Sequence, residues 1–225
     1  MARKAKIDNS KLKRFARKET SRKQDFRAKR RFFLIVCEGA KTEPNYFRGL
    51  EKNLPPGVVN TIELAIEGEG HNTLTVIQDA INAKKRLENQ GRIIDEVWTV
   101  FDRDSFPDQN FNNAIFKGQA LGVHCAWTNE AFELWYLLHF QFFQNGMSRT
   151  DYKAVIEREL SQRIGQPYNY EKNNKDMFTL LQKYGDIKQA MARAKNLEAV
   201  FAGRTDYANH NPCTKVYELL EKLGF

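Results

Sequence analysis

Short apolar runs alternate with amphipathic stretches through roughly the first 130 residues of the chain. The runs are rich in aromatic and β-branched side chains, as expected for strands buried on both faces of a parallel sheet. The amphipathic stretches have helical spacing. Strands are predicted at residues 31–37, 61–66, 96–101 and 123–127, and helices at residues 43–53, 73–89 and 112–121. This alternation predicts a largely parallel four-stranded α/β sheet flanked by helices.

From Ala131 onward the apolar spacing is helical throughout. Five helices are predicted, at residues 131–143, 150–163, 175–183, 186–201 and 213–223. The chain therefore divides into three parts, which are a basic tail (1–31), an α/β core (32–130) and a helical C-terminal region (131–225) packed on that core as a cap. At the start of the first helix, Thr42 is the predicted N-cap and Pro44 occupies an early helical position.

Three acids come directly after two of the predicted buried strands. Glu38 follows the first strand, and Asp102 and Asp104 follow the third. The carboxyl ends of parallel strands form the ligand-binding edge of an open α/β sheet. In an Asp-x-Asp at such an edge the two carboxylates can lie on one side and share a divalent cation, and Mg²⁺ prefers such hard oxygen ligands. Acids at strand ends are also found as solvated loop residues or helix caps.

The excess positive charge of the chain lies in its first 31 residues. The whole chain has a net charge of +8, whereas residues 1–31 hold 14 Lys and Arg against three acids. A basic arm of this kind is typical of segments that contact phosphate backbones. The candidate nucleic-acid-binding residues are Lys11, Lys13, Arg14, Arg17, Lys18, Arg22 and Lys23. Docking on an acidic partner protein, or a purely solubilising role, are the alternatives.

The composition excludes several other classes of protein. Hydrophobic residues make up 41% of the chain, which is enough for a globular core, and there is no apolar run long enough to cross a membrane. We therefore expect a cytoplasmic protein with no membrane association. Three widely spaced cysteines indicate neither a disulfide framework nor a zinc site. The loop at residues 67–70 is too short and too acidic to cradle phosphates, and there is no Walker motif.

The segment from Cys37 to Phe47 (CEGAKTEPNYF) resembles the opening motif of RloB-like proteins. Three further stretches support the resemblance, namely Phe-Asp-Arg-Asp at residues 101–104, TNEAFELWYLLHF at residues 128–140 and NPCTKVY at residues 211–217. That family is similar to Toprim domains, the fold of topoisomerases, primases and OLD-type nucleases. The resemblance implies that Glu38 is the catalytic acid/base, and that Asp102 and Asp104 bind Mg²⁺ or Mn²⁺.

Several further residues are candidates for the same site. Glu133 lies four positions after Asn129 on a predicted helix and could supply a third metal carboxylate, with Glu130 as the alternative. Lys41 could stabilise a transition-state phosphate or simply be exposed. Glu43 could interact favourably with the start of its helix or orient Lys41. His139 is more typical of a core or surface histidine than of a general base.

The sequence therefore predicts a Mg²⁺-dependent Toprim-type nuclease that cleaves RNA, with tRNA as one candidate, or DNA. The resemblance to the abortive-infection AbiL type implies a role in antiviral defence and control by an ABC- or AAA-type ATPase encoded alongside, and leaves homo-oligomerisation open. Two other functions fit the same residues. One is a non-catalytic nucleic-acid-binding subunit of a defence complex, and the other is a primase-like nucleotidyl transferase that uses the metal site in the synthetic direction.

Overall fold

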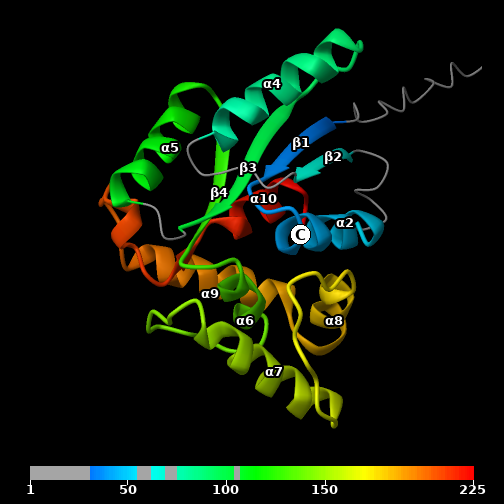
Figure 1. Cartoon of the computed structure of the whole chain (residues 1–225), viewed down its shortest axis with the longest axis vertical. Helices are drawn as coiled ribbons and strands as arrows, with labels where there is room; N and C mark the ends of the chain where they lie inside the picture. The colour runs from blue at the N-terminus through cyan, green and yellow to red at the C-terminus, as the bar shows by residue number, and fades with distance from the viewer. Residues whose placement is uncertain (1–30, 55–61, 69–74, 104–106) are drawn as a thin grey trace, which may run out of the picture.

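A mixed five-stranded sheet forms the centre of the molecule in the computed structural model, which describes residues 31–54, 62–68, 75–103 and 107–225. The strand order is β2-β1-β3-β4-β5 (Figure 1). The first four strands run parallel and β5 runs antiparallel to β4. The strands are β1 (Arg31–Cys37), β2 (Ile62–Gly68), β3 (Glu96–Asp102), β4 (His124–Asn129) and β5 (Cys213–Thr214).

Eight α-helices flank the sheet in the described part of the chain. They are α2 (Thr42–Lys52), α4 (Val76–Asn89), α5 (Asp108–Ala120), α6 (Glu133–Leu138), α7 (Asp151–Ile164), α8 (Met177–Tyr184), α9 (Ile187–Ala199) and α10 (Val216–Lys222), together with the short 3₁₀ helix η1 (Tyr207–Asn209). The predicted α/β class with a mostly parallel sheet is confirmed, and most helices begin and end within a few residues of the predicted positions.

Two hydrophobic clusters cover the two faces of the sheet. One cluster joins the odd-numbered side chains of β1 to α2 and to the C-terminal helices, and the other joins the even-numbered side chains of β1 to α4 and α5. The central strand β1 is therefore buried on both faces, which explains its unbroken apolar run. Helices α6 to α9 gather beyond the carboxyl ends of the parallel strands, in the lower half of Figure 1.

The fifth strand corrects the predicted four-stranded sheet. Cys213 and Thr214 form β5 by pairing with Asn129 and Thr128 of β4, so the last helix begins at Val216 instead of residue 213. The side-chain hydroxyls of Thr128 and Thr214 also form a hydrogen bond with each other, at 2.8 Å. A strand of two residues is too short to show an alternating pattern in the sequence. It is defined only by its pairing with β4.

Two local predictions were also wrong. The apolar stretch predicted as a helix over residues 131–143 is helical only from Glu133 to Leu138, where every residue is buried. The stretch is apolar because α6 is buried on all sides, and not because it forms a long helix. The N-cap of α2 is Lys41 rather than Thr42. The hydroxyl of Thr42 instead donates to the carbonyl of Lys172 at 3.2 Å.

Candidate active site

Two of the predicted acids meet at the ends of neighbouring strands. Asp102 is the last residue of β3, and Glu38 directly follows the parallel strand β1. The backbone N–H of Asp102 donates to Oε2 of Glu38 at 3.3 Å, and the backbone N–H of Glu38 donates to the carbonyl of Val100 at 2.8 Å. The pairing of β1 with β3 thus brings these two residues into contact at the carboxyl edge of the sheet.

Two glutamates from helices join Asp102 around a cavity of about 250 Å³, called here the carboxylate cavity. Glu43 lies in the first turn of α2 and Glu133 is the first residue of α6. Only 4–6% of the surface of Glu43, Asp102 and Glu133 is exposed. The remaining lining residues are Gly39, Ala40, Lys41, Thr42, Arg149 and Lys172.

Gly39 allows the Glu43 side chain to fold back over the loop after β1. A Cβ atom built on Gly39 would lie only 2.3 Å from Oε2 of Glu43 and 3.0 Å from its Cδ. A side chain at position 39 would therefore displace the carboxylate of Glu43. The absence of a side chain at this position is a steric condition for the arrangement of the acids.

Burial and repulsion between neighbouring acids raise the pKa values of two acids of the cavity, Glu43 and Asp102. Burial, and after it the charges of Glu133 and Glu38, raise the pKa of Glu43 to about 7. Burial, followed by the charges of Glu43 and Glu133, also raises the pKa of Asp102 well above its ordinary value. The charge of Arg149 acts in the opposite direction on both groups. The arrangement favours any added positive charge.

Glu133, and not Glu130, lines the carboxylate cavity. Its Oε1 accepts a hydrogen bond from the hydroxyl of Tyr170 at 3.0 Å, which fixes the carboxylate against the helical region. Glu130 lies instead beside Tyr152, where burial first, and then the charges of Glu130 and Asp102, raise the pKa of the phenol. Of the two candidate ligands that the sequence left open, only Glu133 is among the residues that line this cavity.

The residues of the cavity have the chemistry of a divalent-cation site. Oδ1 of Asp102 is buried and has no hydrogen-bond partner in the described part of the chain. Carboxylate oxygens that repel one another suit a hard cation such as Mg²⁺. Within the described residues, however, no three His, Cys, Asp or Glu side chains are arranged closely enough to hold a metal ion. Asp104, the second residue of the predicted metal pair, lies outside the described residues.

The comparison with protein families shows which family the chain belongs to. The family model described as RloB-like protein matches residues 33–223, which is most of the chain. The chain belongs to the RloB-like family. No curated protein and no solved structure matches it significantly. The match includes the two strand ends, both glutamates on helices and the C-terminal region that carries Arg149 and Lys172.

The other candidate residues of this RloB-like chain differ in their burial and in their position relative to the carboxylate cavity. Lys41 is exposed at the mouth of the carboxylate cavity. His139 is buried outside that cavity, and burial lowers its pKa to about 3, so its ring stays neutral near pH 7. Cys37 is buried beneath the site, and burial, followed by the charge of Glu43, raises the pKa of its thiol. The basic residues of the tail lie outside the described residues.

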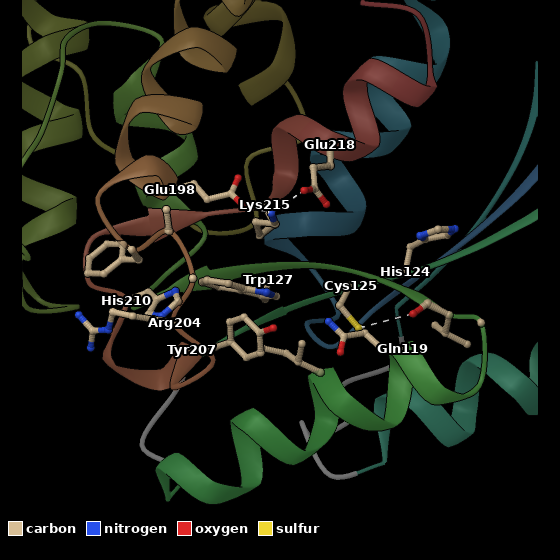
Figure 2. A pocket seen from close by; sticks show the side chains of 16 residues that line it. Gln119, His124, Cys125, Trp127, Glu198, Arg204, Tyr207, His210, Lys215 and Glu218 are labelled. Atoms are coloured by element: carbon tan, nitrogen blue, oxygen red, sulfur yellow. Dashed lines mark hydrogen bonds and ion pairs between the residues drawn. The ribbon is translucent and has the colours of Figure 1, made fainter.

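A second, larger cavity of about 510 Å³ lies along β4 and is called here the β4 cavity (Figure 2). Two of its acids share one lysine. The ammonium group of Lys215 lies between the carboxylates of Glu198 and Glu218, and the hydroxyl of Tyr217 donates to Glu198. The backbone N–H of Lys215 also donates to the carbonyl of Trp127 at 2.8 Å. This part of the closing sequence motif therefore connects β4, α9 and α10.

Sequence reasoning did not assign Glu43, Arg149, Lys172 and Tyr170 to the site. Glu43 is part of the opening motif, but the direction of its side chain depends on where α2 begins. The sequence therefore predicted for it an interaction with the start of its helix or with Lys41. The other three residues come from the region around α7 and the segment before α8, far from the strand ends in sequence. No local signal distinguishes them from the other polar residues of the helical region.

Proposed function

We propose that this RloB-like chain is a divalent-metal-dependent nuclease with a Toprim-like active site. The observation that carries the proposal is the cluster of buried carboxylates beyond the ends of β1 and β3, with cationic side chains around its rim. Buried like charges oppose folding, and perturbed acids in a cavity are typical of functional sites. The family's resemblance to Toprim nucleases supports phosphodiester cleavage as the reaction.

The acids would divide between metal binding and proton transfer. Asp102, with Asp104 from the sequence and Glu133 as the third carboxylate, would hold Mg²⁺ or Mn²⁺. The bound ion would supply charge neutralisation at the phosphate and a more acidic water. Glu38 already accepts a hydrogen bond from the backbone of Asp102 beside the cavity, where it can remove a proton from water or return one to the leaving oxygen. Lys41 is positioned to neutralise charge on the phosphate.

The cellular role follows from the family resemblance. We propose antiviral defence of the abortive-infection type, in which a partner ATPase restrains the nuclease, because an unrestrained nuclease would harm its host. RNA, including tRNA, is the favoured substrate over DNA by analogy with Toprim effectors that disable translation. In cells challenged with phage, variants of Asp102 and Glu38 should then accumulate as folded protein but lose protection.

The direct test is cleavage of labelled tRNA, other RNA and DNA by the purified full chain, with Mg²⁺, with Mn²⁺ and with EDTA. Asp102→Asn and Glu38→Gln should each lower the cleavage rate by at least ~10²-fold. Raising the Mg²⁺ concentration should partly rescue Asp102→Asn, because a weakened ligand responds to mass action. The same increase should not rescue Glu38→Gln, because a missing acid/base is not replaced by metal.

The matched control is Glu221→Gln, which removes an exposed carboxylate on α10 whose partner is Lys195. This variant should cleave at the rate of the unaltered chain. Metal binding is measured separately as the rise in melting temperature on adding Mg²⁺ or Mn²⁺, which Asp102→Asn should reduce. Undiminished cleavage by a Glu38→Gln, Asp102→Asn double variant would overturn the nuclease proposal. Retained nucleic-acid binding without cleavage by any form would favour the non-catalytic binding subunit.

A further inference from the structure

The carboxylate cavity adjoins a second hollow of about 340 Å³ beside the start of α7, called here the side cavity. Glu133, Arg149 and Lys172 line both spaces, so the two cavities are adjacent, and together they are called here the depression. The side cavity is further lined by Lys153, Tyr170, Glu171 and Asn173. A ligand bound at the acids can therefore extend toward α7 without leaving the depression.

Positive and negative side chains are layered in this depression. The acids Glu43, Asp102 and Glu133 form its buried floor, at 4–6% exposure. Lys41, Lys153 and Lys172 are exposed at its rim, and Arg149 is half-buried between the two hollows. A chain of phosphates lying at rim height would contact the cations, and a metal ion held by the acids would supply charge neutralisation at a phosphate.

The segment that carries Lys172 is attached to the start of α2. The hydroxyl of Thr42 donates to the carbonyl of Lys172 at 3.2 Å, and the amide of Asn45 donates to the carbonyl of Asn173 at 3.1 Å. These two bonds hold the backbone of Lys172 beside the start of α2, next to the residue that follows Lys41. Lys153 pairs with Glu157 one turn later on α7 at 3.6 Å, and because the lysine end of this pair is exposed, the pair is of the weak kind that a phosphate can replace.

We propose that this depression is the track of a single nucleic-acid strand. Lys41 and Lys172 contact the phosphate at the acids, and Arg149 and Lys153 contact the next phosphate along the side cavity. The proposal rests on the proposed function for the phosphodiester at the acids, and it assigns the substrate path and its binding residues. The side cavity, at about 340 Å³, is at the lower end of the size range of small-ligand pockets, and the carboxylate cavity, at about 250 Å³, is smaller. These volumes suit roughly one nucleotide and not two paired strands.

The test is binding of labelled single-stranded and duplex oligonucleotides to the full chain in an Asp102→Asn background, over a series of salt concentrations. Lys153→Gln with Lys172→Gln should lower the affinity for the single strand on the order of tenfold. Each lost phosphate contact should also lower the slope of log affinity against log salt by about 0.7, so the pair should lower it by about 1.4. The duplex should bind more weakly than the single strand and be less affected.

The matched control is the pair Lys117→Gln and Lys222→Gln, which removes the same charge from exposed positions on α5 and α10. An equal loss of affinity in this control pair would mean that only net charge matters, and it would overturn the track. The track would also be overturned if the Lys153→Gln, Lys172→Gln variant showed an unchanged slope of log affinity against log salt. An equal loss of affinity for the duplex and for the single strand would overturn it as well.

The outcomes also distinguish the track from the nuclease. A chain that binds single strands through Lys153 and Lys172 but never cleaves with any metal retains the track and loses the proposed activity. A chain that cleaves in an Asp102-dependent way, with an unchanged Michaelis constant in the lysine variants, retains the activity and loses the track.

Discussion

The carboxylate cavity and the β4 cavity both contain glutamates, but the groups around Glu43 in the first and around Glu198 in the second shift their pKa values in opposite directions. In the β4 cavity the ammonium of Lys215 lies between Glu198 and Glu218. Burial raises the pKa of Glu198, but hydrogen bonds from Lys215 and Tyr217 outweigh this, so its pKa is lowered. In the carboxylate cavity burial raises the pKa values of Glu43 and Asp102, and the neighbouring acids raise them further.

The difference indicates what each cluster contributes to the molecule. A cation placed between two acids stabilises a joint between elements, and here that joint connects β4, α9 and α10. Burial and neighbouring acids disfavour the charged forms of Glu43 and Asp102 and so oppose folding, although cationic side chains also line that cavity. Such a cluster is typical of a site whose positive partner is a ligand. Opposite responses to charge removal should therefore separate the two cavities.

The largest expected effect is on stability. Lys215→Met leaves two glutamates facing each other without their cation, and should lower the free energy of unfolding by about 2 kcal/mol. This value is below that of a fully buried pair, because Glu198 and Glu218 are 35% and 39% exposed. Asp102→Asn removes one repelled charge and should leave the free energy unchanged or raise it by up to ~1 kcal/mol in EDTA. Urea unfolding measures both changes.

The control for this comparison is Lys195→Met. Lys195 also joins α9 to α10, through Glu221, but both side chains are exposed, so the change should cost less than ~0.5 kcal/mol. If Asp102→Asn destabilised the chain as strongly as Lys215→Met, the acids of the carboxylate cavity would be structural, and the comparison would fail.

The next effect is on the pH dependence of stability without metal. The pKa of Glu43 is about 7 in the folded chain, above its ordinary value of 4.5. Between these two pH values the folded form binds more protons than the unfolded chain, so stability falls as the pH rises through this window. The expected loss is of the order of 2 kcal/mol, measured by unfolding in EDTA at pH 5 and pH 8.

Glu43→Gln cannot release this proton, so it should reduce the loss. Mg²⁺ should restore stability more at pH 8 than at pH 5, because it binds deprotonated acids. An unaltered chain that becomes more stable between pH 5 and pH 8 in EDTA would contradict the account of repelled acids.

The smallest effect on stability, with a measurable effect on function, is expected from Gly39→Ala. The new Cβ would displace the far end of the Glu43 side chain, which is flexible, so the free energy of unfolding should change by less than ~0.5 kcal/mol. Cleavage should fall by roughly tenfold or more, because the carboxylate is moved out of position. The shorter Glu43→Asp should partly rescue Gly39→Ala in a double-mutant cycle. Additive losses would show that the two positions do not interact.

The sequence determined the parallel part of the sheet and the position of Glu38 and Asp102 at its carboxyl edge. Continuous apolar strands must be buried on both faces, and parallel strands of a sheet end at the same edge. The pairing of β1 with β3 then brings the two acids into contact. The same pattern favoured α/β architecture with a helical C-terminal region, and the family motifs pointed to the RloB-like family that the comparison confirms.

Only the tertiary structure decided which other residues complete the site. Glu43 joins the acids because α2 begins at Thr42, and Glu133 joins them because α6 packs beyond the ends of the strands. Lys172 reaches the cavity through bonds to residues about 130 positions earlier in the chain. Likewise, β5 exists only through its pairing with β4. Contacts between distant segments depend on packing, and no local periodicity in the sequence encodes them.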